Sequence, residues 1–92
     1  MNVGIVGLGL MGGSMAKSIK ARTGHTVWGA DLDQETMSLA RMSGAIDGAL
    51  TEENLRSCDL ILVAVCPGAA IRWVKDHADN IAPPPFWWIC AA

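Results

Sequence analysis

The chain has 92 residues, with 7 basic and 9 acidic side chains and a formal net charge of −2. This length allows one small domain with a hydrophobic core but not a large two-domain enzyme. Hydrophobic residues make up 51% of the chain and charged residues 17%, a composition that excludes an intrinsically disordered protein. The longest apolar run, Leu60 to Cys66, is far shorter than the roughly 20 residues that a membrane-spanning helix needs.

Charge and cysteine content narrow the classes of partner. No basic stripe of the kind that neutralises phosphates is present, so nucleic acid is not an expected partner, and neither is a membrane. The apolar N-terminus lacks the positive segment of a signal peptide. The cysteines are Cys58, Cys66 and Cys90, an odd number without a C-x-x-C spacing. We therefore expect neither a disulfide framework nor a metal site, and a reducing, cytoplasmic location.

The first elements alternate between strand and helix. The β-branched run at residues 2–6 predicts a buried strand, and residues 14–23 predict a helix that places Met15, Ala16 and Ile19 on its apolar face. A second strand is expected at residues 26–30.

The next helix should begin after Asp33, whose side chain is placed to cap it, and end at Gly44. Its inward residues are predicted to be Met37, Ala40 and Met42. Ala45 and Ile46 suggest a short third strand. Thr51, Glu52 and Glu53 then resemble a capped single helical turn.

The clearest strand is Leu60 to Val65, because its uninterrupted apolar run is typical of a parallel strand covered on both faces. Ile71, Val74, Ala78 and Ile81 follow at helical spacing, and Pro83 to Pro85 should end that helix. The alternation of strands and helices predicts an α/β fold, with a parallel sheet, flanking helices and right-handed crossovers. This is the first half of a doubly wound domain.

A glycine motif joins the first strand to the first helix. Its residues are Gly7, Leu8, Gly9, Leu10, Met11 and Gly12, which match G-x-G-x-x-G. In this setting the first glycine permits a tight turn, the second lets the backbone approach a pyrophosphate, and the third lets helix and strand pack closely. The helix N-terminus then attracts the phosphates. The motif makes the fold Rossmann-like and favours a dinucleotide over an ordinary glycine-rich turn.

Asp31 follows Gly12 by 19 residues and lies at the end of the second strand, where an acid binds the adenosine ribose in such folds. Its carboxylate would repel a 2′-phosphate, and the next residue, Leu32, offers no positive charge. NAD is therefore favoured over NADP as cofactor.

Other candidates carry weaker signals. His25 precedes the second strand at the edge away from the ligand, and His77 lies at the far end of a helix, so both are predicted to be solvated residues without a catalytic role. Val65 and Cys66 follow the fourth strand on the ligand side, where their backbone should border the cofactor. Nothing nearby indicates a reactive thiol at Cys66, and no catalytic residue is assigned.

The run from Val3 to Ser14, with its Gly12-Gly13-Ser14 ending, resembles the opening of prephenate dehydrogenases. Residues 24–31, 58–65 and 67–71 support the resemblance, which covers about residues 2 to 85. Hydroxyisobutyrate dehydrogenases share the glycine motif but usually carry proline where this chain has Ser14. The resemblance implies a partial dinucleotide-binding domain over residues 1–85, without the substrate and dimerisation domain.

Residues 86–92, Phe-Trp-Trp-Ile-Cys-Ala-Ala, depart from the family's next strand. Codons for Leu-Val-Asp-Leu-Cys-Ser, read one base later, give Trp-Trp-Ile-Cys-Ala-Ala, so we hypothesise a shifted reading frame. The alternative is an aromatic tail that packs as a fifth strand, since aromatic residues and isoleucine suit strands. Both explanations can hold together.

The resemblance implies an enzyme that oxidatively decarboxylates prephenate to 4-hydroxyphenylpyruvate with NAD, in tyrosine biosynthesis. The family's catalytic histidine corresponds to neither His25 nor His77, so this chain alone is expected to be inactive. The uncovered edge of half a sheet invites a homo-oligomer. Two alternatives stay open: a fragment of a 3-hydroxyisobutyrate-type dehydrogenase, and a non-enzymatic nucleotide-binding or oligomerising module.

Overall fold

The computed structural model describes residues 1–65, 67–77 and 86–89. The strands are β1 (Asn2–Val6), β2 (Thr26–Ala30), β3 (Gly48–Ala49), β4 (Leu60–Val63) and β5 (Phe86–Ile89). The helices are α1 (Leu10–Arg22), α2 (Gln34–Met42), α3 (Glu52–Leu55) and α4 (Pro67–His77).

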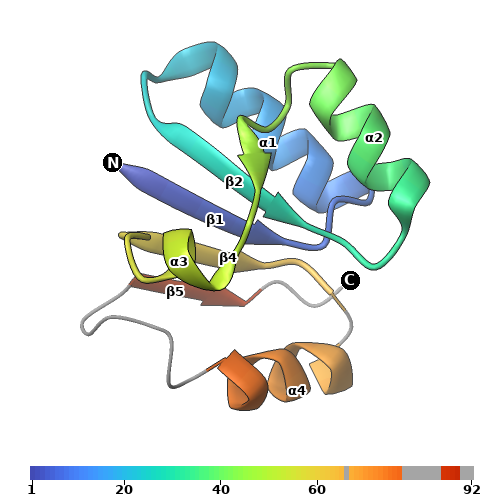
Figure 1. The fold of residues 1–92 in the computed structure, drawn as a ribbon, viewed down its shortest axis with the longest axis vertical. Coiled ribbons are helices and arrows are strands. Elements are labelled where there is room, and N and C mark those ends of the chain that lie inside the picture. Colours follow the sequence, from blue (N-terminus) through green and yellow to red (C-terminus); the bar gives the residue numbers. More distant parts are fainter. Residues whose placement is uncertain (66, 78–85, 90–92) are drawn as a thin grey trace.

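The strands form one parallel sheet in the order β3-β2-β1-β4-β5 (Figure 1). Strand β1 lies at the centre and pairs with β2 on one side and β4 on the other. The chain moves outward from β1 through β2 to β3, then crosses back to β4. The order therefore reverses beside β1, which is where ligands bind in open α/β sheets. The predicted Rossmann-like α/β fold is confirmed.

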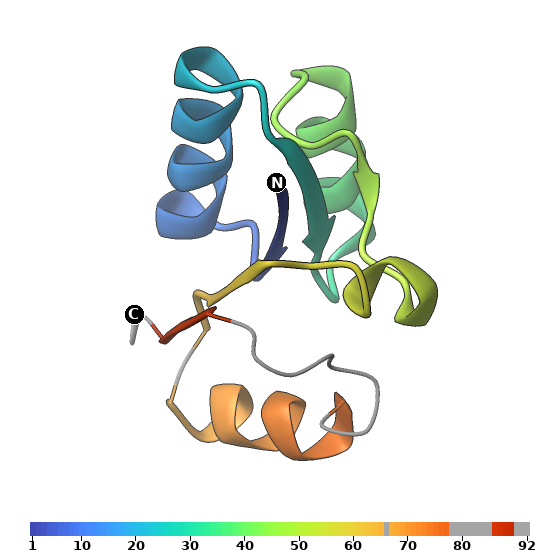
Figure 2. The same ribbon diagram turned by 90° about the vertical axis from the view of Figure 1, so that its left-hand side faces the viewer.

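Two apolar clusters cover the two faces of the sheet. Helices α1 and α2 contribute Ala16 and Ala40 to the first cluster, against Val3, Ile5 and Val27 of the strands. Helices α3 and α4 contribute Leu55 and Ala70 to the second, against Val6, Ile61 and Val63. Figures 1 and 2 accordingly place α1 and α4 on opposite sides of β4. Because both faces of β4 are covered, its continuous apolar sequence is explained.

The helix ends follow the sequence signals. The Asp33 carboxylate accepts a hydrogen bond from the backbone N–H of Glu35 and caps α2. Thr51 and Asn54 form a reciprocal capping box on α3. After α2, the N–H of Ala45 donates to the carbonyl of Ala40 at 3.0 Å, which closes a Schellman turn.

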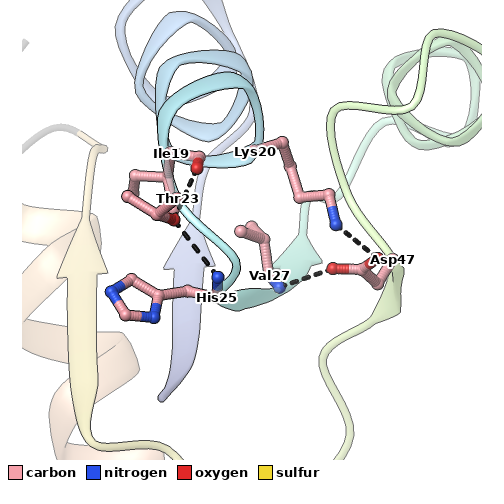
Figure 3. A network of polar contacts seen from close by, with 6 residues as sticks. All are labelled: Ile19, Lys20, Thr23, His25, Val27 and Asp47. Atoms are coloured by element: carbon pink, nitrogen blue, oxygen red, sulfur yellow. Dashed lines mark hydrogen bonds and ion pairs between the residues drawn. The ribbon is translucent and has the colours of Figure 1, made fainter.

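Asp47 links three elements at the start of β3 (Figure 3). Its Oδ1 accepts from the Lys20 ammonium of α1 at 2.8 Å, and its Oδ2 accepts from the backbone N–H of Val27 in β2 at 2.7 Å. Both bonds lower the pKa of the Asp47 carboxyl below its usual value, and the bond from Lys20 has the larger effect. The same figure shows Thr23 bonded to the carbonyl of Ile19 at the end of α1.

Several predicted positions in the first three strands and two helices need correction. Helix α1 begins at Leu10, before the expected Ser14. Ala45 and Ile46 are buried but lie before β3, whose pairing begins at Gly48 once Asp47 has bonded to Val27. Met42 is 84% exposed, because it falls on the solvent side of the last turn of α2.

The later elements also differ from expectation. Strand β4 ends at Val63, two residues early. In α4, Ile71 is 56% exposed while Ala70 is fully buried, so the buried face lies one residue away from the predicted one. Ala78 and Ile81 fall outside the described residues. Strand β5 occupies the segment for which a fifth strand was the alternative, and a shifted reading frame for this segment stays a prediction.

Candidate functional site

The glycine turn leaves the carboxyl end of β1 between the ends of β2 and β4. Gly7 has φ +93°, and a Cβ placed there would lie 2.6 Å from the carbonyl oxygen of Ala64, so only glycine fits. Its N–H donates to the Ala30 carbonyl at 2.7 Å, and the Ala64 N–H donates to the Val6 carbonyl at 2.7 Å. The turn is therefore held by both neighbouring strands.

Gly9 and Gly12 meet very different surroundings. A Cβ on Gly12 would lie 1.8 Å from the Gly7 carbonyl oxygen, whereas one on Gly9 would have nothing within 4 Å. Gly9 precedes α1, and no side chain caps that helix. The first N–H groups of a helix have no partner within the helix, and the space into which a Gly9 Cβ would project is open. Leu10 and Met11 contribute backbone at this point as the first residues of α1.

The Asp31 carboxylate lies against this turn. Its Oδ2 accepts a hydrogen bond from the backbone N–H of Leu8 at 2.8 Å, and its Oδ1 accepts from the N–H of Asp33 at 2.9 Å. The aspartate thus connects the glycine turn after β1 with the loop after β2. Each oxygen keeps lone pairs for a further donor, since a carboxylate offers about four acceptor sites. The spacing between Gly12 and Asp31 therefore brings the two predicted parts together in space.

A cleft of about 460 Å³ opens between this corner and α4. Its walls are formed by Val6, Gly7, Ala30, Asp31, Leu32, Val65, Ala69, Arg72, Trp73, Asp76 and His77. Val65 lies in the wall next to Gly7, at the position expected for it. Cys66 falls outside the described residues. Of the described predicted residues, Gly7, Asp31 and Val65 line the cleft, while the remaining motif glycines form the adjoining turn.

The two histidines lie in different parts of the fold. His25 lies at the opposite edge of the sheet, where its Nδ1 is 2.9 Å from the N-terminal amine. The prediction that it stays away from the ligand edge agrees with this position. For His77 the solvated-face prediction is wrong, because its ring is half-buried, stacks on Trp73 and lines the cleft.

The wall of the cleft on α4 was not predicted from the sequence; it is formed by Ala69, Arg72, Trp73, Asp76 and His77. A signal was available, because these residues recur at steps of three and four, the spacing of one helix face. The apolar spacing that began at Ile71 masked it. Leu32, which is 103% exposed, was noted for its lack of charge but not as part of a wall.

Within the described residues, no helix is long and apolar enough to cross a membrane. The same residues contain no cluster of three or more His, Cys, Asp or Glu side chains able to hold a metal ion. The site consists of a backbone turn, the Asp31 carboxylate that contacts it, and a cleft whose far wall carries Arg72, Asp76 and His77.

The parallel sheet, the glycine turn at its reversal point and the acid after β2 define a dinucleotide-binding α/β domain. Comparison with known families identifies the family to which this domain belongs. The family model for the NAD binding domain of 6-phosphogluconate dehydrogenase matches residues 2–84. The chain belongs to this family of NAD-binding domains. A search of curated proteins gave no significant match.

Solved structures add two similar proteins. Synechocystis arogenate dehydrogenase is 25% identical, with a TM-score of 0.90 over 99% of this chain and 33% of that one. Prephenate dehydrogenase from A. aeolicus, in complex with hydroxyphenyl propionate and NAD⁺, is 28% identical, with a TM-score of 0.80 over 97% of this chain and 32% of that one. This chain therefore spans about a third of the length of these dehydrogenases. The family resemblance read from the sequence is confirmed.

Proposed function

We propose that this chain binds the ADP half of NAD and represents the NAD-binding portion of a dehydrogenase acting on prephenate or a closely related substrate. The observation that carries the proposal is the contact of the Asp31 carboxylate with the Leu8 N–H at 2.8 Å. It holds an acid beside an uncapped helix N-terminus, at the edge of a cleft. That combination suits an adenosine diphosphate, whose sugar donates hydrogen bonds and whose phosphates accept them.

The space beside Gly9 fits a diphosphate. A Cβ at Gly9 would project into this space without touching the protein, so the absence of a side chain leaves room for a ligand rather than for packing. The free N–H groups at the start of α1 would donate to the phosphate oxygens, and the helix dipole favours negative charge there. Gly7, Leu8, Gly9, Leu10, Met11 and Gly12 are the residues we assign to this part of the site.

Asp31 would bind the adenosine ribose and set the choice of cofactor. Its two oxygens already hold the loop in place through Leu8 and Asp33, and their remaining lone pairs could accept from ribose hydroxyls. A 2′-phosphate in that position would bring negative charge against the carboxylate. Leu32 adds no compensating charge, so NAD should bind more tightly than NADP. Val65 and Cys66 are assigned to the rim that leads toward the nicotinamide.

The chain alone should not catalyse hydride transfer. NAD supplies a nicotinamide ring that accepts a hydride, and dehydrogenation also needs a group that removes the hydroxyl proton. His25 is at the far edge of the sheet and His77 is held against Trp73, so neither is placed for this task. We expect no NADH absorbance at 340 nm when the purified chain is incubated with prephenate and NAD. Sustained NADH production would contradict this part of the proposal.

The binding site can be tested by titrating NAD into the purified chain, with Asp31→Asn compared against Glu35→Gln. Asparagine keeps a carbonyl oxygen that can accept from the Leu8 N–H but removes the charge. Glu35 is an exposed acid in the first turn of α2 and does not line the cleft, so its variant controls for the change in net charge. Loss of a charge-assisted hydrogen bond should weaken NAD binding about 10- to 100-fold in Asp31→Asn only.

NADP provides the second part of the test. The unmodified chain should prefer NAD by at least about tenfold, and Asp31→Asn should narrow that preference because the repulsion is removed. Unchanged NAD affinity in Asp31→Asn, with an unchanged melting temperature, would show that the assigned ribose contact is wrong.

A further inference from the structure

The α4 wall of the cleft presents one side chain whose orientation is fixed from two directions. The rings of His77 and Trp73 stack with centroids 4.3 Å apart and an interplanar angle of 18°. The Nδ1 atom of His77 also lies 2.8 Å from the backbone carbonyl oxygen of Trp73. Stacking and hydrogen bond together hold the imidazole in one position on the cleft wall.

This geometry determines where the proton of a neutral His77 lies. A carbonyl oxygen only accepts hydrogen bonds, so Nδ1 must be the donor and carry the hydrogen. Nε2 of the neutral ring is then an acceptor. Among the described residues Nε2 has no hydrogen-bond partner, so its lone pair is available to a ligand in the cleft.

We propose that His77 reads the base of the bound nucleotide by accepting a hydrogen bond from the exocyclic amino group of adenine. This inference rests on the proposed function, which puts the ribose at Asp31 and leaves the base in the same cleft. Hypoxanthine carries an oxo group in place of the amino group. Two acceptors would then face each other, so the cleft should select adenine.

The other polar groups of the cleft are less suited to this role. Arg72 offers only donors and cannot accept from an amino group. Asp31 is bonded to Leu8 and Asp33 and is assigned to the ribose. Asp76 could accept, but no hydrogen bond within the described residues fixes its exposed side chain, whereas His77 is held in place. A pre-oriented acceptor loses less conformational entropy on binding.

The test compares the affinities of NAD⁺ and nicotinamide hypoxanthine dinucleotide for the whole 92-residue chain, by calorimetry at pH 8. We expect NAD⁺ to bind about 5- to 10-fold more tightly, the contribution of one neutral hydrogen bond. His77→Phe keeps a ring against Trp73 but removes both nitrogens, and it should bring the two affinities within about twofold. Asp76→Ala, which removes the other possible acceptor on this wall, should retain the preference.

The outcomes separate the inference from the proposed function. Equal binding of the two dinucleotides at pH 8, or loss of selectivity in Asp76→Ala rather than His77→Phe, would overturn the role of His77 alone. Failure of both dinucleotides to bind would overturn the proposed function and the inference with it.

Discussion

Alanine at Gly9 and at Gly12 should separate cofactor binding from folding, because the two positions differ in what surrounds them. A Cβ at Gly12 would lie 1.8 Å from a backbone oxygen, far below the 3.0 Å that real Cβ atoms respect. Relief requires α1 to move away from the turn by about 1 Å, and overpacking of this kind costs up to about 3 kcal/mol. With roughly 4–8 °C lost per kcal/mol in a domain of this size, we expect the melting temperature of Gly12→Ala to fall by up to roughly 12–24 °C.

Gly9→Ala should weaken NAD binding while changing the melting temperature much less than Gly12→Ala does. Its Cβ meets nothing within 4 Å, and its φ of −70° suits any residue. The only folding cost is the poorer N-cap that alanine makes, about 0.5–1 kcal/mol, or a decrease of at most roughly 8 °C. Yet the new methyl group fills the space assigned to the pyrophosphate, so NAD affinity should drop by at least about tenfold.

Thermal unfolding followed by circular dichroism, together with NAD titration, checks both variants. Gly24→Ala is the matched control, because a Cβ at this exposed loop position also meets nothing within 4 Å and lies far from the cleft. It should leave both quantities nearly unchanged. NAD binding by Gly9→Ala at the affinity of the unmodified chain would refute the assignment of the phosphates to this turn. A Gly12→Ala melting temperature within a few degrees would refute the packing argument.

Two further predictions concern titratable groups. Asp47→Asn should destabilise the chain at pH 7 by about 1 kcal/mol or less, because the side chains of the Lys20–Asp47 pair are 32% and 34% exposed. The same variant should leave NAD binding unchanged. The bonds to Lys20 and Val27 lower the pKa of Asp47 in the folded chain. Their contribution to the free energy of unfolding is therefore fully present above the pKa of an unfolded aspartate, about 3.9, and is lost as the pH falls through the lower pKa of the folded state. Urea unfolding should thus show that the free energies of unfolding of the unmodified chain and Asp47→Asn differ less at pH 3 than at pH 7. A larger difference at pH 3 would contradict the lowered pKa of Asp47. Burial, with a smaller effect of the Asp59 charge, raises the pKa of the Cys58 thiol to about 11. Iodoacetamide at pH 8 should therefore leave Cys58 unmodified in the native chain and alkylate it in the unfolded chain, as measured by peptide mapping.

The parts of the site made of backbone were predictable from the sequence. A tight turn needs glycine at Gly7, close contact needs it at Gly12, and the length of one helix and one strand fixes where Asp31 falls. These requirements are local, so they leave a spacing in the sequence that can be recognised without knowing the tertiary structure. The parallel pairing of the strands followed in the same way, from chain alternation and right-handed crossovers.

The wall formed by α4 could not be derived so directly. Its residues offer two interleaved spacings, and the one that begins at Ile71 contains more aliphatic residues, while the other combines Ala70 with Trp73 and His77. The sheet instead receives Ala70, whose small side chain is fully buried. This rotation turns Trp73 and His77 toward the cleft. Which spacing prevails depends on how closely the helix approaches β4, and that is decided by packing against residues distant in the sequence.

Asp31 stabilises the very corner to which we assign the ribose, and this has a consequence for any attempt to alter cofactor choice. The carboxylate satisfies the N–H groups of Leu8 and Asp33, each of which would lose a partner if the side chain were shortened. An unsatisfied, partly buried donor costs about 1–3 kcal/mol, a large share of the stability of a small domain. Asp31→Ala should therefore lose stability as well as NAD affinity, whereas Asp31→Asn, which keeps one acceptor oxygen, should lose mainly affinity. Engineering NADP specificity would need a replacement that still accepts from the Leu8 N–H while it removes the negative charge.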